Sequence, residues 1–320
     1  MRSTLRGVFL VVLATALFVT MNSAVKYLGA YLPTVELIWA RTLAHLIFMV
    51  VVFSPTHGGW RLFVTRRPGL QLGRSLLLLV STSLFFTALK HVPLAEATAV
   101  SFTSPFMVAV LAGWVLGERV GHVHWLAIAL GFVGALMVIR PGTGAIDPYL
   151  FLVVGNAACY AGYQVLTRRV AAYDRPETSV SYDALIGTVL LSAAVPFFWQ
   201  TPRESWHWVL LGVIGLLGGL GHYCGARALV STPASILAPM YYVQLISAAV
   251  LGYVLFGDVP SAWTWAGAAL IVASGVTIAW WESFGRPPGG LGALRGPPSK
   301  SENSGRARAL DERPRTRGSS

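Results

Sequence analysis

Long apolar runs separated by short polar segments dominate the chain as far as residue 281. About 20 helical residues are needed to cross the hydrocarbon core of a bilayer. The runs are too long, and alternate too little, for the strands of a membrane β-barrel. We therefore predict an all-α, polytopic membrane protein with ten transmembrane helices, at residues 7–27, 34–54, 72–90, 94–116, 123–140, 148–168, 179–199, 207–228, 233–256 and 262–281.

Composition supports the membrane assignment. Hydrophobic residues make up 55% of the chain and charged residues only 12%, whereas soluble domains average about 25% charged residues. The first apolar run follows Arg2 and Arg6 but has no clear small-x-small cleavage site. We expect it to be the first membrane helix and not a cleaved signal peptide.

The hydrophobic pattern repeats at an offset of 140 residues, as these matching pairs show: Ala88-Leu89-x-x-x-Pro93 with Ala228-Leu229-x-x-x-Pro233, Gly117-Glu118 with Gly257-Asp258, and Trp125 with Trp265. Each copy holds five predicted helices. Because five is odd, the second copy inserts upside down, and the two copies form an inverted repeat. We expect the first repeat at residues 1–142 and the second at 143–282.

The net charge of +11 follows the predicted topology. With the N-terminus inside, eleven arginines fall in inner segments: Arg2, Arg6, Arg61, Arg66, Arg67, Arg74, Arg119, Arg168, Arg169, Arg175 and Arg227. The outer segments hold four basic residues: Lys26, Lys90, Arg140 and Arg203. This bias predicts cytoplasmic N- and C-termini in the cell (inner) membrane, and it argues against a nucleic-acid partner.

The segment 283–320 is rich in Gly, Pro, Ser and Arg and poor in apolar residues. Such a composition cannot bury enough surface to fold alone. We expect a disordered basic cytoplasmic tail, for which contact with anionic membrane lipid is one role.

Two stretches resemble the EamA domain of the ten-helix drug/metabolite transporter superfamily. The first runs from Pro93-Leu94-Ala95-Glu96-Ala97 to Gly117-Glu118 and the Trp125–Gly134 run, and the second from Pro233-Ala234-Ser235 through Gly257-Asp258 to Ser274-Gly275. The resemblance implies a 5+5 inverted repeat, a central substrate cavity, and export or exchange of small organic solutes. Met21 to Lys26 and Trp39-Ala40-Arg41 are most similar to the branch with the S-adenosylmethionine carriers, and amino acids are another class that members handle. Many second copies carry Glu-Pro in the ninth helix, where this chain has Gln244-Leu245.

Polar residues inside predicted helices indicate where a cavity lies, because polar groups facing hydrocarbon are costly. Asn156, Tyr160, Tyr163, Gln164 and Thr167 share one helical face. This face is either a substrate-binding wall or a set of interhelical hydrogen bonds. Further substrate-binding candidates are Asn22 in the first helix and Tyr241, Tyr242 and Gln244 in the ninth. Pro105 and Pro239 permit kinks in the fourth and ninth helices.

Of the ionisable residues within predicted membrane helices, Arg41, Asp183 and His222 are the candidates for substrate binding or coupling. Arg41 is about 10 Å below the outer boundary by helix rise, where it either anchors a substrate carboxylate or phosphate or pairs with or snorkels toward Glu36. Asp183 is its counterpart in the second repeat and is expected near the inner side, not beside Arg41. It is a proton or cation site, or a boundary carboxylate paired with Arg168. His222 is either a proton relay or a packed, hydrogen-bonded histidine.

These patterns predict a secondary transporter of a small organic metabolite that works by alternating access, with proton or ion coupling as an option. The substrate-binding candidates are Asn22, Arg41, Tyr160, Tyr163, Gln164, Tyr241, Tyr242 and Gln244, and the coupling candidates are Asp183 and His222. The sequence has no P-loop and no catalytic or metal-ligand motif, so we expect no enzyme activity, cofactor or metal. The alternative is a non-transporting membrane scaffold or sensor with the same fold.

Overall fold

A computed structural model describes residues 2–57, 59–116, 121–140, 147–232, 237 and 240–284. Across these ranges the structure contains helices and loops but no strand. The helices are α1 (Arg2–Leu28), α2 (Thr34–His57), η1 (Gly59–Phe63), α3 (Pro68–Leu89), α4 (Leu94–Ser101), α5 (Ser104–Leu116), α6 (His122–Ile139), α7 (Tyr149–Val170), α8 (Pro176–Ala194), η2 (Val195–Phe197), α9 (Ser205–Ser231), α11 (Val243–Phe256) and α12 (Ala262–Phe284). The predicted tail, 283–320, lies almost wholly outside the described residues.

The helices confirm the predicted all-α, ten-helix membrane fold. Eight stretches within the described ranges are long and apolar enough to cross a membrane, and α11 and the first part of α12 are shorter apolar helices. The fourth span is α4 followed by α5, with a break at Phe102 and Thr103. This break lies just before Pro105, where we expected a kink. Pro239 lies outside the described residues.

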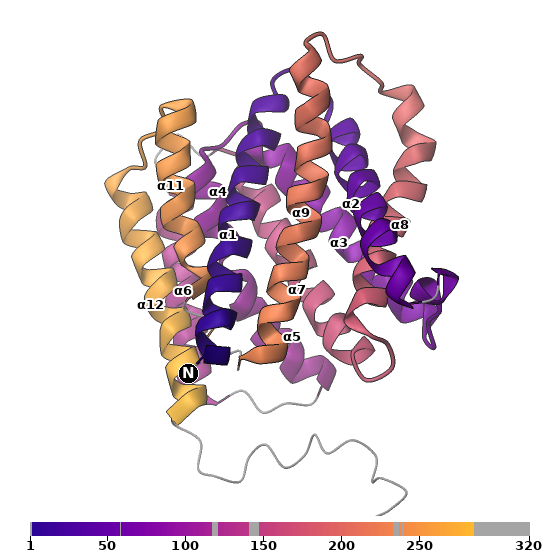
Figure 1. Cartoon of the computed structure of the whole chain (residues 1–320). Helices are drawn as coiled ribbons and strands as arrows, with labels where there is room; N and C mark the ends of the chain where they lie inside the picture. The colour runs from indigo at the N-terminus through magenta and orange to yellow at the C-terminus, as the bar shows by residue number, and fades with distance from the viewer. Residues whose placement is uncertain are drawn as a thin grey trace, which may run out of the picture. The chain divides into compact units, whose positions relative to one another are not determined.

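The packing of the helices shows the inverted repeat. In the first repeat α1, α2, α3, α4–α5 and α6 correspond to α7, α8, α9, α11 and α12 in the second. α1 packs along α9, and the equivalent pair, α7 and α3, packs in the same way. Two helices also contact their own counterparts in the other repeat: α2 contacts α8, and α4 contacts α11. Figure 1 shows α1 lying beside α9 near the middle of the bundle.

Two glycines allow α6 and α12 to cross in close contact. A Cβ on Gly134 would lie 2.7 Å from the carbonyl oxygen of Gly267, and a Cβ on Gly267 would lie 2.4 Å from that of Gly134. Small residues at such crossings let helix backbones approach, which is a main source of helix association in membranes.

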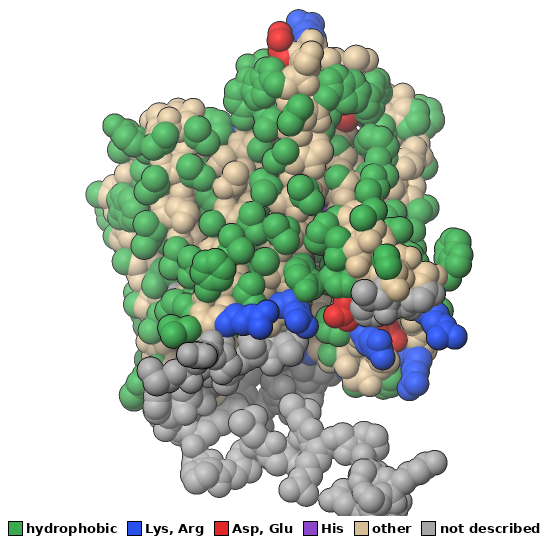
Figure 2. Space-filling model, viewed as in Figure 1, with side chains coloured by type: hydrophobic (Ala, Val, Ile, Leu, Met, Phe, Trp, Pro, Cys, Tyr) green, Lys and Arg blue, Asp and Glu red, His purple; other side chains and the backbone are tan. Residues whose placement is uncertain are grey.

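The loop before α3 and the loop before α8 meet at one end of the bundle. Asp174 accepts hydrogen bonds from the Thr65 hydroxyl, the Arg66 backbone N–H (3.1 Å) and the Gln71 side chain (2.9 Å). The Tyr182 hydroxyl donates to the carbonyl oxygen of Phe63 at 3.0 Å. These bonds place several of the predicted inner arginines at one end, and Figure 2 shows blue side chains gathered along the lower edge of the bundle.

Candidate functional site

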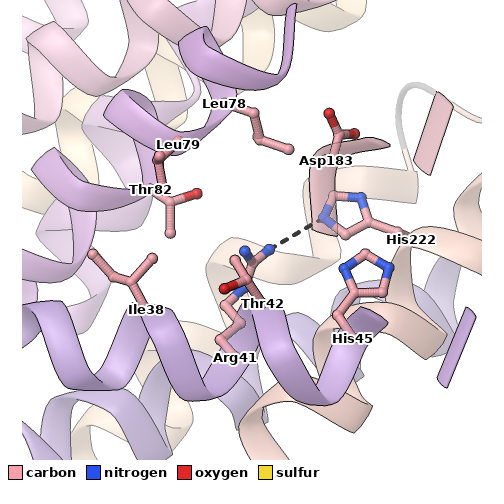
Figure 3. Close-up of a pocket in the computed structure, with 9 residues that line it drawn as sticks. All are labelled: Ile38, Arg41, Thr42, His45, Leu78, Leu79, Thr82, Asp183 and His222. Carbon is pink, nitrogen blue, oxygen red and sulfur yellow. Dashed lines mark hydrogen bonds between the residues drawn. The ribbon is translucent and has the colours of Figure 1, made fainter. Parts of the chain in front are cut away.

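A small polar pocket lies where α2, α3, α8 and α9 come together. Its lining residues are Ile38, Arg41, Thr42, His45, Leu78, Leu79, Thr82, Asp183 and His222, and Figure 3 shows Arg41, His45, His222 and Asp183 grouped on one side. The free volume is about 10 Å³, which holds about one water molecule. In this conformation the pocket is too small to hold a metabolite.

Arg41 supplies a buried guanidinium without a carboxylate partner among the described residues. It is 6% exposed, one terminal nitrogen lies 3.3 Å from Nε2 of His222, and its Nε has no hydrogen-bond partner. The expected alternative pairing with Glu36 is not found, because Glu36 accepts the backbone N–H of Gln200 at 3.1 Å. A buried cation without a counter-ion is costly, so Arg41 stays the candidate for anion binding in the pocket.

Asp183 is paired with Arg74. The Arg74 terminal nitrogens donate to Oδ2 of Asp183 at 2.6 and 3.1 Å, and Arg74 also donates to the carbonyl oxygen of Ser179 at 2.6 Å. Arg168, one of the alternatives for Asp183, is therefore not its partner. Arg74, counted above among the arginines of the inner segments, is fully buried, 0% exposed, inside α3.

The remaining lone pairs of Asp183 are also engaged. The Ser75 hydroxyl donates to Oδ1 at 2.8 Å, and the Tyr163 hydroxyl donates to Oδ2 at 3.2 Å. The Arg74 guanidinium lies over the Tyr163 ring, 4.8 Å from its centroid. Asp183 and Arg74 therefore form an electrically neutral pair that ties α3, α7 and α8 together, although Nε of Arg74 has no hydrogen-bond partner among the described residues.

Asp183 also lines the same pocket as Arg41, which contradicts the expectation that inversion keeps the two apart. Both residues lie seven positions after the first residue of their helix, Thr34 for α2 and Pro176 for α8. Each is about 10 Å deep by helix rise, but they enter from opposite sides of the membrane. Because α2 and α8 pack against each other, two depths of about 10 Å in a core of about 30 Å bring both near the middle.

His222 lies between Arg41 and two rings. Its ring stacks on His45 at 5.9 Å with an interplanar angle of 3°, and it meets the Phe18 ring edge-on at 5.0 Å. Nε2 of His45 has no hydrogen-bond partner. This geometry matches the expected packed, hydrogen-bonded histidine. Because His222 lines the pocket, it also stays a candidate for proton binding.

The polar face of α7 is divided between two roles. Asn156 serves interhelical bonding, because its amide donates to the Ser81 hydroxyl at 2.7 Å and carbonyl at 3.0 Å and its Oδ1 accepts from Ser101 at 3.2 Å. Tyr163 supports Asp183. Tyr160 is half-buried and stacks on Tyr163 at 5.5 Å.

Gln164 and Asn22 remain candidates without a contact to the pocket. Gln164 is half-buried, and it makes no side-chain hydrogen bond to the described residues. Asn22 is buried on α1, and its Oδ1 has no partner within the described ranges. The two residues are 142 positions apart, the offset that relates the starts of the repeats.

Of the candidates of the ninth helix, Tyr241 and Tyr242 directly precede α11, and Gln244 is the second residue of α11. Tyr242 packs its ring against Phe102, and its hydroxyl lies so close to Gly275 that a Cβ there would be 1.5 Å away. Tyr241 packs against the buried cluster of Val11, Ala228 and Leu237. Gln244 is half-buried. None of the three lines the pocket.

Sequence reasoning missed Arg74, Ser75, His45 and Thr82. Gln71, Arg74 and Ser75 follow the spacing i, i+3, i+4, which puts them on one helical face. That spacing was the available signal. His45 follows Arg41 by four residues and so shares its face.

Comparisons with known proteins agree with this architecture. The model of the EamA-like transporter family matches residues 5–140 and 147–280. A riboflavin transporter of Vibrio cholerae serotype O1 is 30% identical over 285 residues, covering 87% of this chain and 94% of the relative. The pseudopaline exporter CntI of Pseudomonas aeruginosa is 31% identical over 278 residues, covering 85% and 95%.

More distant relatives include an S-adenosylmethionine uptake transporter of Rickettsia felis, 26% identical over 258 residues, which covers 80% of this chain and 86% of the relative. One solved structure superposes with a TM-score of 0.60 at 19% identity, covering 87% of this chain and 96% of that one. That likeness concerns the fold alone. With two matched segments and a ten-helix inverted repeat, the chain is a multi-pass membrane protein that belongs to the EamA-like transporter family.

Proposed function

We propose that the protein is a secondary transporter that exports or exchanges a small metabolite carrying an anionic group, and that Arg41 binds this group. The supporting observation is the buried guanidinium of Arg41, which has no carboxylate partner among the described residues and lines a pocket. A guanidinium binds a carboxylate or phosphate through paired hydrogen bonds. The names of the relatives support a small-metabolite cargo and include both uptake and export.

The charges around the pocket favour an anion over a cation or a zwitterion. Arg74 and Asp183 compensate each other at 2.6 Å, which leaves Arg41 as the uncompensated charge. A substrate ammonium would need a free carboxylate, and Asp183 is already saturated by Arg74, Ser75 and Tyr163. Amino-acid-like substrates fit this arrangement through their carboxylate.

The small size of the pocket and the two-repeat architecture support alternating access. A site near the middle of an inverted repeat, with helices of both repeats around it, is typical of secondary transporters. We further propose that the protein lies in the cell (inner) membrane with both termini in the cytoplasm, since the inner arginines outnumber the outer basic residues.

Flux into proteoliposomes tests the proposal. The purified full chain is reconstituted, and uptake of a panel of organic anions and matched neutral amides is measured. We expect saturable flux of at least one anion, lost in Arg41→Gln and partly kept in Arg41→Lys. Arg203→Gln, an exposed arginine before α9, is the control and should retain full flux.

The same assay decides between a transporter and a scaffold or sensor. A scaffold or sensor shows no saturable flux. Its cellular function is unchanged when Arg41, Tyr160 and Gln164 are replaced by apolar residues. Saturable flux of neutral amides that survives Arg41→Gln would contradict the anionic-substrate proposal while leaving a transporter.

A further inference from the structure

We infer that the pocket binds a doubly negative group together with one proton, and that His222 carries the proton. This inference rests on the proposed function and names the substrate class and the coupling of the same site. Its basis is the contact between Arg41 and His222 and the balance of charges around them (Figure 3).

The contact between Arg41 and His222 fixes the state of the imidazole in this conformation. A guanidinium has donors only, so Arg41 donates and Nε2 of His222 accepts at 3.3 Å. An imidazolium carries a hydrogen on both ring nitrogens and has no lone pair for this bond. His222 is therefore neutral while the pocket is closed and Arg41 faces it.

The groups around His222 leave one positive charge in excess. From α2 it faces Arg41 and His45, from α8 the carboxylate of Asp183, and from α3 Arg74, which neutralises Asp183. α1 contributes the uncharged ring of Phe18. On α7, Tyr160 and Tyr163 are neutral phenols, and the Tyr163 hydroxyl donates a hydrogen bond to Asp183. A proton on His222 in the empty pocket would add a second uncompensated charge where water is scarce, which is unfavourable.

A ligand changes this balance. A singly negative group neutralises Arg41 and leaves no charge for a proton to offset. A doubly negative group leaves one negative charge over, and it draws the Arg41 donors away from Nε2 of His222, which frees that nitrogen to bind a proton. The proton comes from solvent and moves with the ligand, and no covalent bond is made or broken. A phosphate monoester and a dicarboxylate share this chemistry.

Proton-linked anion binding tests the inference. The full chain in lipid nanodiscs is titrated with sulfate and succinate as doubly negative probes and with formate and acetate as singly negative probes. Calorimetry between pH 6 and 8, in buffers of different ionisation enthalpy, counts the protons taken up. We expect about one proton per sulfate or succinate, none per formate or acetate, and about tenfold weaker sulfate binding for each rise of one pH unit, as linkage requires.

Variants locate the proton. His222→Gln and His222→Asn should keep some sulfate binding but lose the proton uptake and the pH slope. His91→Gln is the control, because His91 stacks on Tyr149 away from the pocket, and it should behave as the wild type. If the His222 variants do not fold, the proton count of the wild-type chain still decides whether a proton is bound.

The possible outcomes separate the two proposals. Sulfate binding that depends on Arg41 but takes up no proton overturns the coupling and leaves the anion site standing. Proton uptake that survives His222→Gln and disappears in His45→Gln overturns the assignment to His222. If none of the four anions binds, and flux is found only for neutral compounds, the proposed function itself fails. If sulfate binds with uptake of a proton and succinate does not bind, the site is assigned to phosphate-like groups.

Discussion

The rings of Phe102 and Tyr242 contact each other with their centroids 5.0 Å apart, and the two residues occupy the same position in the two repeats, since 242 minus 102 is 140. Phe102 follows α4 where the fourth helix breaks, and Tyr242 precedes α11. Residues related by a two-fold axis contact each other only close to that axis. The axis that relates the repeats therefore passes between these rings, and the two interruptions face each other across it.

The ion pair of Arg74 and Asp183 should behave as one unit. Breaking a buried pair from one side costs about 3–5 kcal/mol, because the remaining charge loses its partner. We expect Arg74→Met and Asp183→Leu each to lower the thermal stability strongly, and the double variant to be more stable than either. Thermal unfolding of the detergent-solubilised protein measures this. Ser75→Ala, which removes one hydrogen bond, should cost only about 1 kcal/mol; additive losses in the double variant would contradict a coupled pair.

The ion pair of Lys26 and Asp258 should hold one end of the bundle closed. Lys26 donates to Asp258 at 2.7 Å and to the carbonyl oxygen of Val92 at 2.9 Å, so it joins α1 to both neighbouring loops. In a chain without Cys159 and Cys224, a cysteine at Ser23 should react faster with a maleimide after Lys26→Gln or Asp258→Asn. The exchanged pair, Lys26→Asp with Asp258→Lys, should restore slow labelling. Equal labelling in all variants would show that the pair does not control access.

The crossing of α6 and α12 should not tolerate a side chain. Gly134→Ala or Gly267→Ala places a Cβ within 2.7 or 2.4 Å of the opposite carbonyl oxygen, and the backbones must separate. We expect each change to destabilise by about 1–3 kcal/mol, as overpacking does. Gly212→Ala on α9 is the matched control, since nothing lies within 4 Å of its Cβ position. It should be neutral or slightly stabilising, because alanine favours the helix over glycine.

The contact that Asp174 makes between the loop before α3 and the loop before α8 should weaken at low pH. Burial acts to raise the pKa of Asp174, but hydrogen bonds from Thr65, Gln71 and the Arg66 backbone, together with the charge of Arg66, outweigh it and lower the pKa. A lowered folded-state pKa means that the stabilisation is present above the unfolded value of about 4 and is lost as the pH falls through the folded value. Hydrogen exchange of residues 64–67 should therefore accelerate in acid beyond its intrinsic pH trend. Asp174→Asn should remove that extra dependence, and identical profiles would disprove it.

The sequence predicted the helices and the repeat well, because both depend on local runs of apolar residues and on self-similarity. It failed where contacts between neighbouring helices determine the arrangement. Arg74 is near the start of α3, where the sequence is equally compatible with an exposed arginine and with a buried one. Only the contact with Asp183 of α8 distinguishes the two. The depth of Arg41 followed from helix rise, but its place beside the same pocket as Asp183 depends on how α2 packs against α8. Sequence alone also gave no means to see that Asp183 would be saturated.

The pairing of α1 with α9, and of α7 with α3, has a consequence for how the chain is made. The first helix of each repeat packs along the third helix of the other repeat. Residues 1–142 on their own therefore lack the surfaces that complete the bundle. Arg74 enters the membrane 109 residues before its partner Asp183 is synthesised. During that interval its long side chain must reach toward the headgroups near the start of α3. We therefore expect biogenesis to have a defined order, in which the first five helices wait in a loose arrangement until α8 arrives and draws Arg74 inward.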